Sequence, residues 1–213
     1  MRTLLFIIIG YLGGSLLFAR YFGKLFGKKD ITSDSTDKNP GTFNAFKYGG
    51  FLCGTLTLCC DLLKGFLPVF FYQYGNLYAG GLGLALVLAA PVCGHVLPIF
   101  HKFKGGKGIA VSFGCLLGML PDVRPVLVLA CVFLFFSLVI NITPNYHKTF
   151  FTYLFAIFGM RLLVPNPAVS LGFAIAAVLV MLKLMFSTEK REPFKIKMGI
   201  VRKQGLHPVE HND

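Results

Sequence analysis

Long apolar stretches separated by short polar ones dominate this sequence. A helix needs about 20 apolar residues to cross the hydrocarbon core of a bilayer. By that measure the chain contains seven candidate spans, at residues 4–22, 50–73, 78–99, 108–120, 125–142, 149–163 and 168–186. The pattern predicts an all-α fold, a polytopic membrane helix bundle of about seven transmembrane helices. A membrane domain over residues 1–186 is expected to be followed by a basic cytoplasmic tail over residues 187–213.

The third and fourth spans are the least regular. Pro91 and Pro98 interrupt the third, and the fourth contains only about a dozen apolar residues. Irregular backbone persists at membrane depth only where protein or a water-lined cavity covers it. Short or broken segments of this kind often border a polar site. We therefore expect the functional site to lie beside these two spans.

Basic residues are concentrated on one side of the predicted bundle. The chain is 55% hydrophobic and 14% charged, and 21 basic against nine acidic residues give a formal net charge of +12. Because the charge flanks apolar spans, membrane lipids rather than nucleic acid are the expected partner. The seven-span order places 15 lysines and arginines on one side, and only Arg2, Arg124 and Arg161 on the other. The bias predicts a cytoplasmic C-terminus and an outside N-terminus, and a five-span arrangement keeps the same cytoplasmic loops.

The most informative polar segment connects the third and fourth spans. Two lysines bracket a glycine pair in the order Lys104, Gly105, Gly106, Lys107, and Gly108 leads into the next apolar run. Glycines permit close approach of a ligand, N–H groups at the N-terminus of a helix attract anions, and lysines add positive charge. The segment therefore predicts a phosphate site, although it lacks the first glycine of a Walker A loop. A basic turn that only fixes the topology is the alternative.

Three further ionisable residues lie within the predicted spans. His95 stands near the cytoplasmic end of the third span, where it is either a packed, hydrogen-bonded residue or a proton acceptor or donor beside the glycine loop. Asp61 and Lys64 lie at i and i+3 in the second span, on one helix face. Ionisable residues at membrane depth usually pair with each other or line a functional interior. We predict that Asp61 and Lys64 form an ion pair that supports the site.

The first predicted cytoplasmic loop, residues 30–50, is rich in turn formers, hydroxyls and amides. One interpretation is a solvated loop with local caps. Another is that Asp30, Asp34 and Asp37 hold a divalent cation that bridges to phosphate. The six cysteines all lie in apolar stretches without metal-ligand spacing. We therefore predict no resident metal, no disulfide framework and no cofactor.

The segment around the glycine loop resembles a known signature. It matches that of the bacterial membrane glycerol-3-phosphate acyltransferases that use acyl phosphate, the PlsY family, through Gly94-His95-x-x-Pro98-x-Phe100-x-x-Phe103-Lys104-Gly105-Gly106-Lys107-Gly108. The first loop is similar too, since the family's Asn-x-Gly-Ala-Thr-Asn run is matched by Asn39-Pro40-Gly41-Thr42-Phe43-Asn44. Lys47 stands where the family has an arginine, and Asp61-x-x-Lys64-Gly65 follows at the family's spacing. The similarity covers roughly residues 4–140.

The resemblance implies a reaction and a set of site residues. The fold would have seven membrane helices in a bacterial cell membrane. The reaction would be acyl transfer from acyl phosphate to the 1-hydroxyl of glycerol 3-phosphate, or of a related polyol phosphate, giving lysophosphatidic acid. Acyl phosphate is already activated, so positioning and charge neutralisation are the main requirements. The implied catalytic residues are Thr36 or Asp37 in place of a family serine, with His95, Lys104 and Lys107. The implied substrate-binding residues are Asn39, Gly41, Asn44, Lys47, Gly105, Gly106 and Gly108, supported by Asp61 and Lys64.

Three segments depart from the family pattern. The family's Gly-Ser-Gly is replaced by Thr36-Asp37-Lys38, and a serine-rich third motif by the segment 143–149. The family's C-terminal motif is not recognisable in the tail. An anionic Asp37 beside a phosphate is unfavourable unless a cation or a lysine compensates it. The alternative function is therefore a divergent, non-catalytic membrane protein that binds phosphate or phospholipid, or a small transporter.

Overall fold

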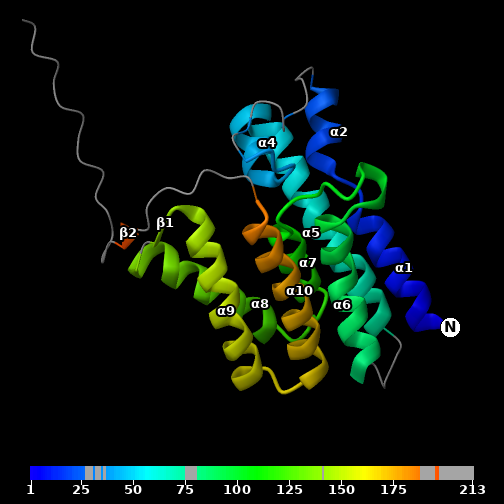
Figure 1. Cartoon of the computed structure of the whole chain (residues 1–213). Coiled ribbons are helices and arrows are strands. Elements are labelled where there is room, and N and C mark those ends of the chain that lie inside the picture. Colours follow the sequence, from blue (N-terminus) through cyan, green and yellow to red (C-terminus); the bar gives the residue numbers. More distant parts are fainter. Residues whose placement is uncertain are drawn as a thin grey trace, which may run out of the picture.

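The computed structural model describes residues 1–26, 31, 35, 37–74, 81–140, 142–187 and 195–196, and helices dominate it (Figure 1). In chain order the elements are α1 (Arg2–Gly14), α2 (Phe18–Leu25), α4 (Thr42–Gly49), α5 (Phe51–Gln73), α6 (Gly81–Val96), the 3₁₀ turn η1 (Ile99–His101), α7 (Ile109–Leu117), α8 (Arg124–Leu134), the π-helical turn η2 (Phe135–Val139), β1 (Ile142–Thr143), α9 (Asn145–Leu163), α10 (Pro167–Met185) and β2 (Lys195–Ile196). The two short strands pair with each other, antiparallel. The predicted all-α membrane bundle is confirmed.

Each of the seven predicted spans contains a helix, but the helices differ in length. Within the described residues, four helical segments are long and apolar enough to cross a membrane: Arg2–Leu25, Phe51–Gln73, Gly81–His101 and Pro167–Met185. The shorter apolar segment Arg124–Val139 accompanies them. At nine residues α7 is only about 14 Å long, which is less than half of the hydrocarbon core. The protein therefore crosses the membrane several times, and the count of seven stays a prediction.

The first predicted span is not one continuous helix. α1 ends at Gly14 and α2 begins at Phe18, so the residues between them leave the helical path. A helix break inside a membrane frees carbonyl groups that must find donors within the protein. Leu16 is at this break, and its carbonyl oxygen accepts a hydrogen bond from Nζ of Lys64 on α5 at 2.6 Å. The break in the first span is thus stabilised by the ionisable pair of the second.

The third span is interrupted later than its sequence predicts. α6 runs through Pro91 and ends at Val96, so the expectation that Pro91 breaks this helix is wrong. The backbone at Pro91 instead packs against α1, where a Cβ at Gly14 would collide with the carbonyl oxygen of Pro91. Gly94 makes the reciprocal approach to the Tyr11 carbonyl. Small residues allow helix backbones to approach closely within a membrane, so α1 and α6 form one tightly packed pair.

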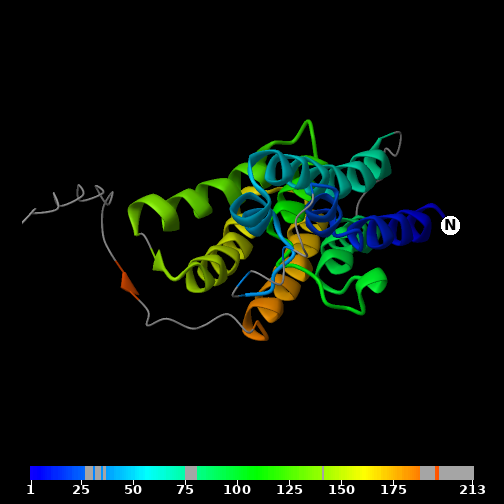
Figure 2. The same cartoon turned by 90° about the horizontal axis from the view of Figure 1, so that it is seen from above.

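α6 is the central helix of the bundle. It packs against α1 on one side and α10 on the other, and it also contacts α5 and α7. In its most apolar window 67% of the residues are buried, against 28% in the first span. Figure 2 shows α1 at one edge of the bundle and α8 with α9 toward the opposite edge. Of the four long helical segments, the one that leads into the glycine loop is therefore the most buried.

α7 is held against α5 by a second pair of glycines. A Cβ at Gly65 would collide with the backbone of α7 at Val111, and one at Gly114 would collide with the Leu62 carbonyl of α5. The close packing fixes the first turn of α7, which follows Gly108, relative to Asp61 and Lys64 on α5. The sequence Asp61-x-x-Lys64-Gly65 therefore combines an ionisable pair with the contact that positions the glycine loop.

Candidate active site

A cavity of about 460 Å³ lies between the first loop, the ends of α5 and α6, the glycine loop and α7 to α9. The polar lining comes from Asp37, Asn39, Gly41, Thr42, Asn44, Lys47, Tyr48, Asp61, His95, Lys107, Gly108, Asn145, Lys148 and Thr149. The apolar lining comes from Phe43, Leu58, Ile109, Ala110, Phe113 and Phe133. One hollow thus combines a polar, charged part with a wall of apolar side chains, as an amphiphilic ligand requires.

The glycine loop, residues 104–108, packs directly against His95. The Gly106 N–H donates to the His95 carbonyl at 3.0 Å, and a Cβ at Gly106 would collide with Nε2 of the His95 ring. Only glycine therefore fits directly above the imidazole. Gly108 closes the loop in the left-handed region, at φ 80°, and starts α7. The sequence Gly-Gly-Lys-Gly is explained by one close approach and one left-handed turn.

Several amides of this loop already have protein acceptors. The Lys104 N–H donates to the His101 carbonyl at 3.0 Å, and the Lys107 N–H donates to Oδ1 of Asn39 at 3.1 Å. With the Gly106 bond, these contacts use N–H groups that the sequence predicts as part of an open phosphate cradle. The positive charge available to an anion in this cavity therefore comes mainly from lysine side chains.

Asp37 is clamped beside the glycine loop. Its Oδ1 accepts hydrogen bonds from Nδ2 of Asn44 at 2.8 Å and from the Asn39 N–H at 3.2 Å, and its Oδ2 is 3.1 Å from Nζ of Lys107. Burial alone raises the pKa of Asp37, but the Asn44 hydrogen bond and the Lys107 charge outweigh it and lower the pKa below its usual value. Lys107 thus compensates the negative charge of this carboxylate.

The two asparagines of the first loop are engaged with the protein itself. The second proton of Asn44 Nδ2 goes to the Asn39 carbonyl at 2.8 Å, and Asn44 is buried. Both asparagines therefore hold the first loop and the glycine loop together while they line the cavity. Thr36, Asp30 and Asp34 lie outside the described residues, so the structure gives no information on their predicted roles.

Three lysines line the cavity. Lys107 comes from the glycine loop, Lys47 from α4, and Lys148 from the first turn of α9. Lys104, which the resemblance places at the catalytic centre, has an exposed side chain and is not part of the lining. Gly105 and Gly106 are buried within the loop and do not line the cavity. The cavity therefore gathers lysines from three separate segments of the chain.

Asp61, Lys64 and His95 form a buried cluster at the bottom of the cavity. Nζ of Lys64 is 2.7 Å from Oδ1 of Asp61 and 2.9 Å from Nδ1 of His95. All three residues are at most 7% exposed. Removing one partner from a buried ion pair costs about 3–5 kcal/mol because the other charge is left uncompensated. The structure confirms the ion pair that the i, i+3 spacing predicts and adds His95 to it.

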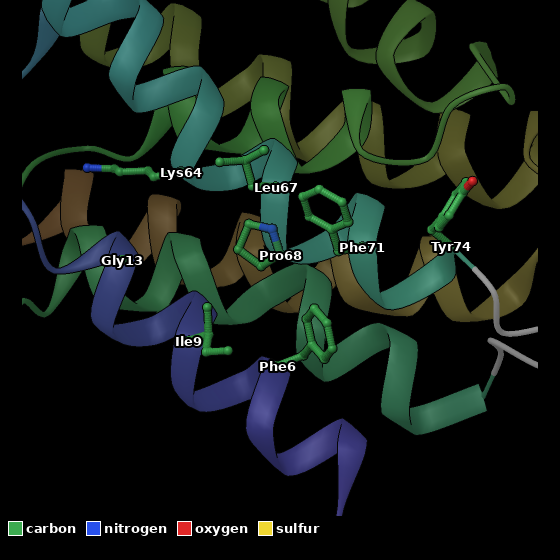
Figure 3. A pocket seen from close by; sticks show the side chains of 8 residues that line it. All are labelled: Phe6, Ile9, Gly13, Lys64, Leu67, Pro68, Phe71 and Tyr74. Atoms are coloured by element: carbon green, nitrogen blue, oxygen red, sulfur yellow. The ribbon is translucent and has the colours of Figure 1, made fainter.

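A second hollow lies between α1 and α5. This groove of about 620 Å³ is formed by Phe6, Ile9 and Gly13 of α1 and by Lys64, Leu67, Pro68, Phe71 and Tyr74 of α5 and its C-cap. Figure 3 shows apolar side chains along the groove, with the Lys64 ammonium pointing away from them. Because the ammonium is bonded to Asp61 and His95, the groove presents only the aliphatic stem of this lysine.

The family profile of "Glycerol-3-phosphate acyltransferase" matches residues 4–193 of the chain. The chain belongs to this family. Glycerol-3-phosphate acyltransferases from Methylobacillus flagellatus and Cupriavidus necator are 38% and 41% identical over 136 and 123 residues. These alignments cover 63% and 57% of this chain, and 67% and 60% of the relatives. The crystal structure of PlsY in its glycerol 3-phosphate form superposes with a TM-score of 0.73 at 25% identity, covering 86% of this chain and 88% of that one.

The segment 143–149 also contributes to the polar lining of the cavity. Lys148 and its neighbours Asn145 and Thr149 line the cavity, although the sequence comparison with the family treats their segment only as a departure. In the sequence these residues form a cluster of polar and basic side chains at the start of a span. Such clusters also occur at ordinary helix ends, so this one did not stand out. Their role became visible only when the start of α9 was placed opposite the glycine loop.

Proposed function

We propose that this protein is an integral membrane acyltransferase that moves a fatty acyl group from acyl phosphate to the 1-hydroxyl of glycerol 3-phosphate, forming lysophosphatidic acid for phospholipid synthesis. The observation that supports the proposal most directly is the single cavity in which Lys47, Lys107 and Lys148 stand beside an apolar wall. The lysines suit phosphoryl groups, and Phe113 and Phe133 suit an acyl chain. Family membership and the similarity to PlsY in its glycerol 3-phosphate form support the same reaction.

The chemistry fits a cavity without a strong nucleophile. The acceptor hydroxyl oxygen forms a bond to the acyl carbon, and the bond between that carbon and the phosphate oxygen breaks. The hydroxyl proton leaves with inorganic phosphate, which is a sufficient base once released. The protein has to hold two anions close together and neutralise their charge, and preorganised cations perform this task without rearrangement during the reaction.

The cavity is charged in a way that suits two anions. Asp37 removes part of the charge of Lys107, because their side chains are 3.1 Å apart. Lys148 adds a positive charge from the opposite wall. We infer that Lys107 binds one phosphoryl group together with Lys47, and that Lys148 replaces charge that Asp37 neutralises. The altered first loop and the altered third motif then compensate each other.

The orientation proposed from the basic residues agrees with the arrangement of the helices. In Figure 1 the segments predicted to be cytoplasmic, namely α2 with α4, the glycine loop, the start of α9 and the end of α10, lie at one end of the bundle. The N-terminus lies toward the other end. We propose that the polar part of the cavity faces the cytoplasm of a bacterial cell, that the N-terminus is outside, and that residues 187–213 form a basic tail at the inner leaflet.

The function is tested by acyl transfer with purified protein. Wild-type protein is expected to form lysophosphatidic acid from acyl phosphate and glycerol 3-phosphate. Lys107→Ala is expected to reduce the rate at least about 100-fold, because an electrostatic group of the cavity is lost. Lys102→Ala, at an exposed lysine of the same turn, is the matched control. Equal rates for Lys107→Ala and wild type would reject the site. Phosphate binding without acyl transfer would instead support the alternative, a non-catalytic phosphate-binding membrane protein.

A further inference from the structure

The contacts within the buried cluster of Asp61, Lys64 and His95 determine which ring nitrogen of His95 carries a proton. Nζ of Lys64 has three polar partners: it is hydrogen-bonded to the Leu16 carbonyl at 2.6 Å and to Nδ1 of His95 at 2.9 Å, and it forms an ion pair with Oδ1 of Asp61 at 2.7 Å. An ammonium group has three protons and accepts none. Beside an ammonium group, the Leu16 carbonyl oxygen and the ionised Asp61 carboxylate can only act as acceptors. The third partner, Nδ1 of His95, must then accept the remaining proton.

The same result follows from the other neutral distribution of protons between the acid and the amine. If the proton of the Asp61–Lys64 pair sits on the carboxyl group, the amine lone pair accepts it and two N–H groups remain. Those two groups donate to the Leu16 carbonyl and to Nδ1 of His95. In both cases the cluster has no net charge, as burial at membrane depth favours, and Nδ1 carries no proton.

Two other neutral arrangements put a proton on Nδ1. One has a cationic imidazole and an uncharged amine, and it is disfavoured because an alkyl amine is the stronger base by about four pKa units. The other has the acid proton on Oδ2 of Asp61, and it is disfavoured because the 2.7 Å contact between Nζ and Oδ1 is as short as a contact between charged groups. A ring whose Nδ1 already accepts a hydrogen bond from Lys64 therefore stays neutral. Its single proton is on Nε2.

With Nδ1 bonded to Lys64, Nε2 is the ring nitrogen of His95 that is left for a ligand of the cavity. His95 lines the cavity at the end of α6, and Nε2 lies directly beneath Gly106 of the glycine loop. Among the described residues, Nδ1 has Lys64 as its hydrogen-bond partner and Nε2 has none. The ring is 2% exposed in the protein, so an N–H at this position has its hydrogen bond satisfied when an acceptor enters the cavity.

We propose that His95 is a fixed hydrogen-bond donor, whose Nε2–H contacts a phosphoryl oxygen of the bound substrate, and that Asp61 and Lys64 are positioning residues that set this tautomer. The assignment deepens the proposed function and excludes His95 as the base that deprotonates the acceptor hydroxyl. A donor of this kind keeps the same state during turnover, so it costs no reorganisation when negative charge develops on the leaving phosphate.

The tautomer is measured directly by nitrogen NMR of protein labelled at histidine, with the His95 signals identified by their loss in His95→Gln. Near neutral pH a protonated, pyrrole-type Nε2 and a bare, pyridine-type Nδ1 are expected. Addition of inorganic phosphate is expected to shift the Nε2–H proton signal downfield. A protonated Nδ1, a cationic ring, or an Nε2–H signal unchanged by saturating phosphate would overturn the proposal.

Two substitutions at His95 separate donation from base catalysis. Gln places an N–H₂ group near the position of Nε2, whereas Leu fills the space without a donor. His95→Gln is expected to retain acyl transfer within about tenfold of wild type, and His95→Leu to lose about 100-fold, since a hydrogen bond to a charged group is worth about 1.5–3 kcal/mol. Equal losses in two folded variants would overturn the donor role.

A control at the positioning residues tests how the tautomer is set. The double variant Asp61→Asn with Lys64→Met keeps the cluster uncharged and removes the donor to Nδ1. In this variant we expect the single His95 proton to distribute between both ring nitrogens, whereas an unchanged pure Nε2–H signal would show that Lys64 does not set it. If the expected NMR results appear but wild-type protein transfers no acyl group, the proposed function fails and the assignment of His95 stands.

Discussion

The cavity and the groove both include residues of α5 but differ in their chemistry. The cavity is lined by three lysines, two aspartates and His95, whereas the groove, among the described residues that line it, has Lys64 as its one charged side chain. That lysine turns its ammonium into the cluster beneath the cavity. The helix thus separates a region that can hold phosphoryl groups from one that suits only hydrocarbon. The chemistry of the lining, and not the volume, therefore distinguishes the site.

The largest expected effect separates Gly106, which packs on His95 next to the cavity, from Gly13 in the groove. Gly106→Ala places a methyl group against Nε2 of His95, so the glycine loop has to move away. A displacement of about 1 Å in a positioning element costs about 100-fold in rate. We expect at least this loss of acyl transfer in Gly106→Ala. Gly13 lines the groove, and a Cβ added there meets no atom within 4 Å. Gly13→Ala is therefore expected to keep the wild-type rate.

This comparison breaks down if the two alanine variants behave alike. Both variants are first checked for correct folding by thermal unfolding in detergent. An active Gly106→Ala would mean that the seat of the loop on His95 is unimportant. An inactive but folded Gly13→Ala would mean that the reaction takes place in the groove and not in the cavity.

A smaller effect is expected from the lysine of α9. Lys148→Met removes one of the three positive charges of the cavity and keeps most of the side-chain volume. A charge-assisted contact is worth about 1.5–3 kcal/mol, so we expect the KM for one of the two anionic substrates to rise at least about tenfold. Steady-state kinetics with each substrate varied in turn identifies which. Lys102→Met is the control, and an unchanged KM for both substrates would remove Lys148 from the site.

The smallest effect is expected in the groove. Phe71 is 51% exposed there, so Phe71→Ala is expected to leave the rate with long-chain acyl phosphate within about twofold of wild type. Phe113 is its counterpart in the cavity, where it packs on Phe133 with ring centroids 5.9 Å apart. Phe113→Ala should raise the KM for long-chain donors more than for short ones. The reverse result would place the acyl chain in the groove.

The sequence predicted the parts of the site that depend on local pattern. The glycine loop was recognisable because Gly-Gly-Lys-Gly between two apolar runs is uncommon and its resemblance to a family signature is specific. Asp61 and Lys64 were predicted as a pair because a spacing of three residues fixes one helix face. Both predictions concern residues near each other in the chain, where backbone geometry alone decides which side chains meet.

Features that depend on contacts between distant segments could not be predicted. The break between α1 and α2 occurs in an apolar run that reads as one span, and it is stabilised by a residue 48 positions further along the chain. Pro91 is tolerated inside α6 because α1 packs against its backbone at Gly14. Likewise, the Lys107 N–H is bonded to Asn39, 68 residues away, so the sequence overestimated how open the amides of the glycine loop are.

The hydrogen bond from Lys64 to Leu16 has a consequence for how the protein is made. Leu16 emerges from the ribosome long before Lys64, so its carbonyl group lacks this donor while the first segment is entering the bilayer. The break between α1 and α2 therefore completes its hydrogen bonding only after α5 arrives with its lysine. Substitution of Lys64 should be felt first as reduced yield of inserted protein during synthesis, before any catalytic property is measured.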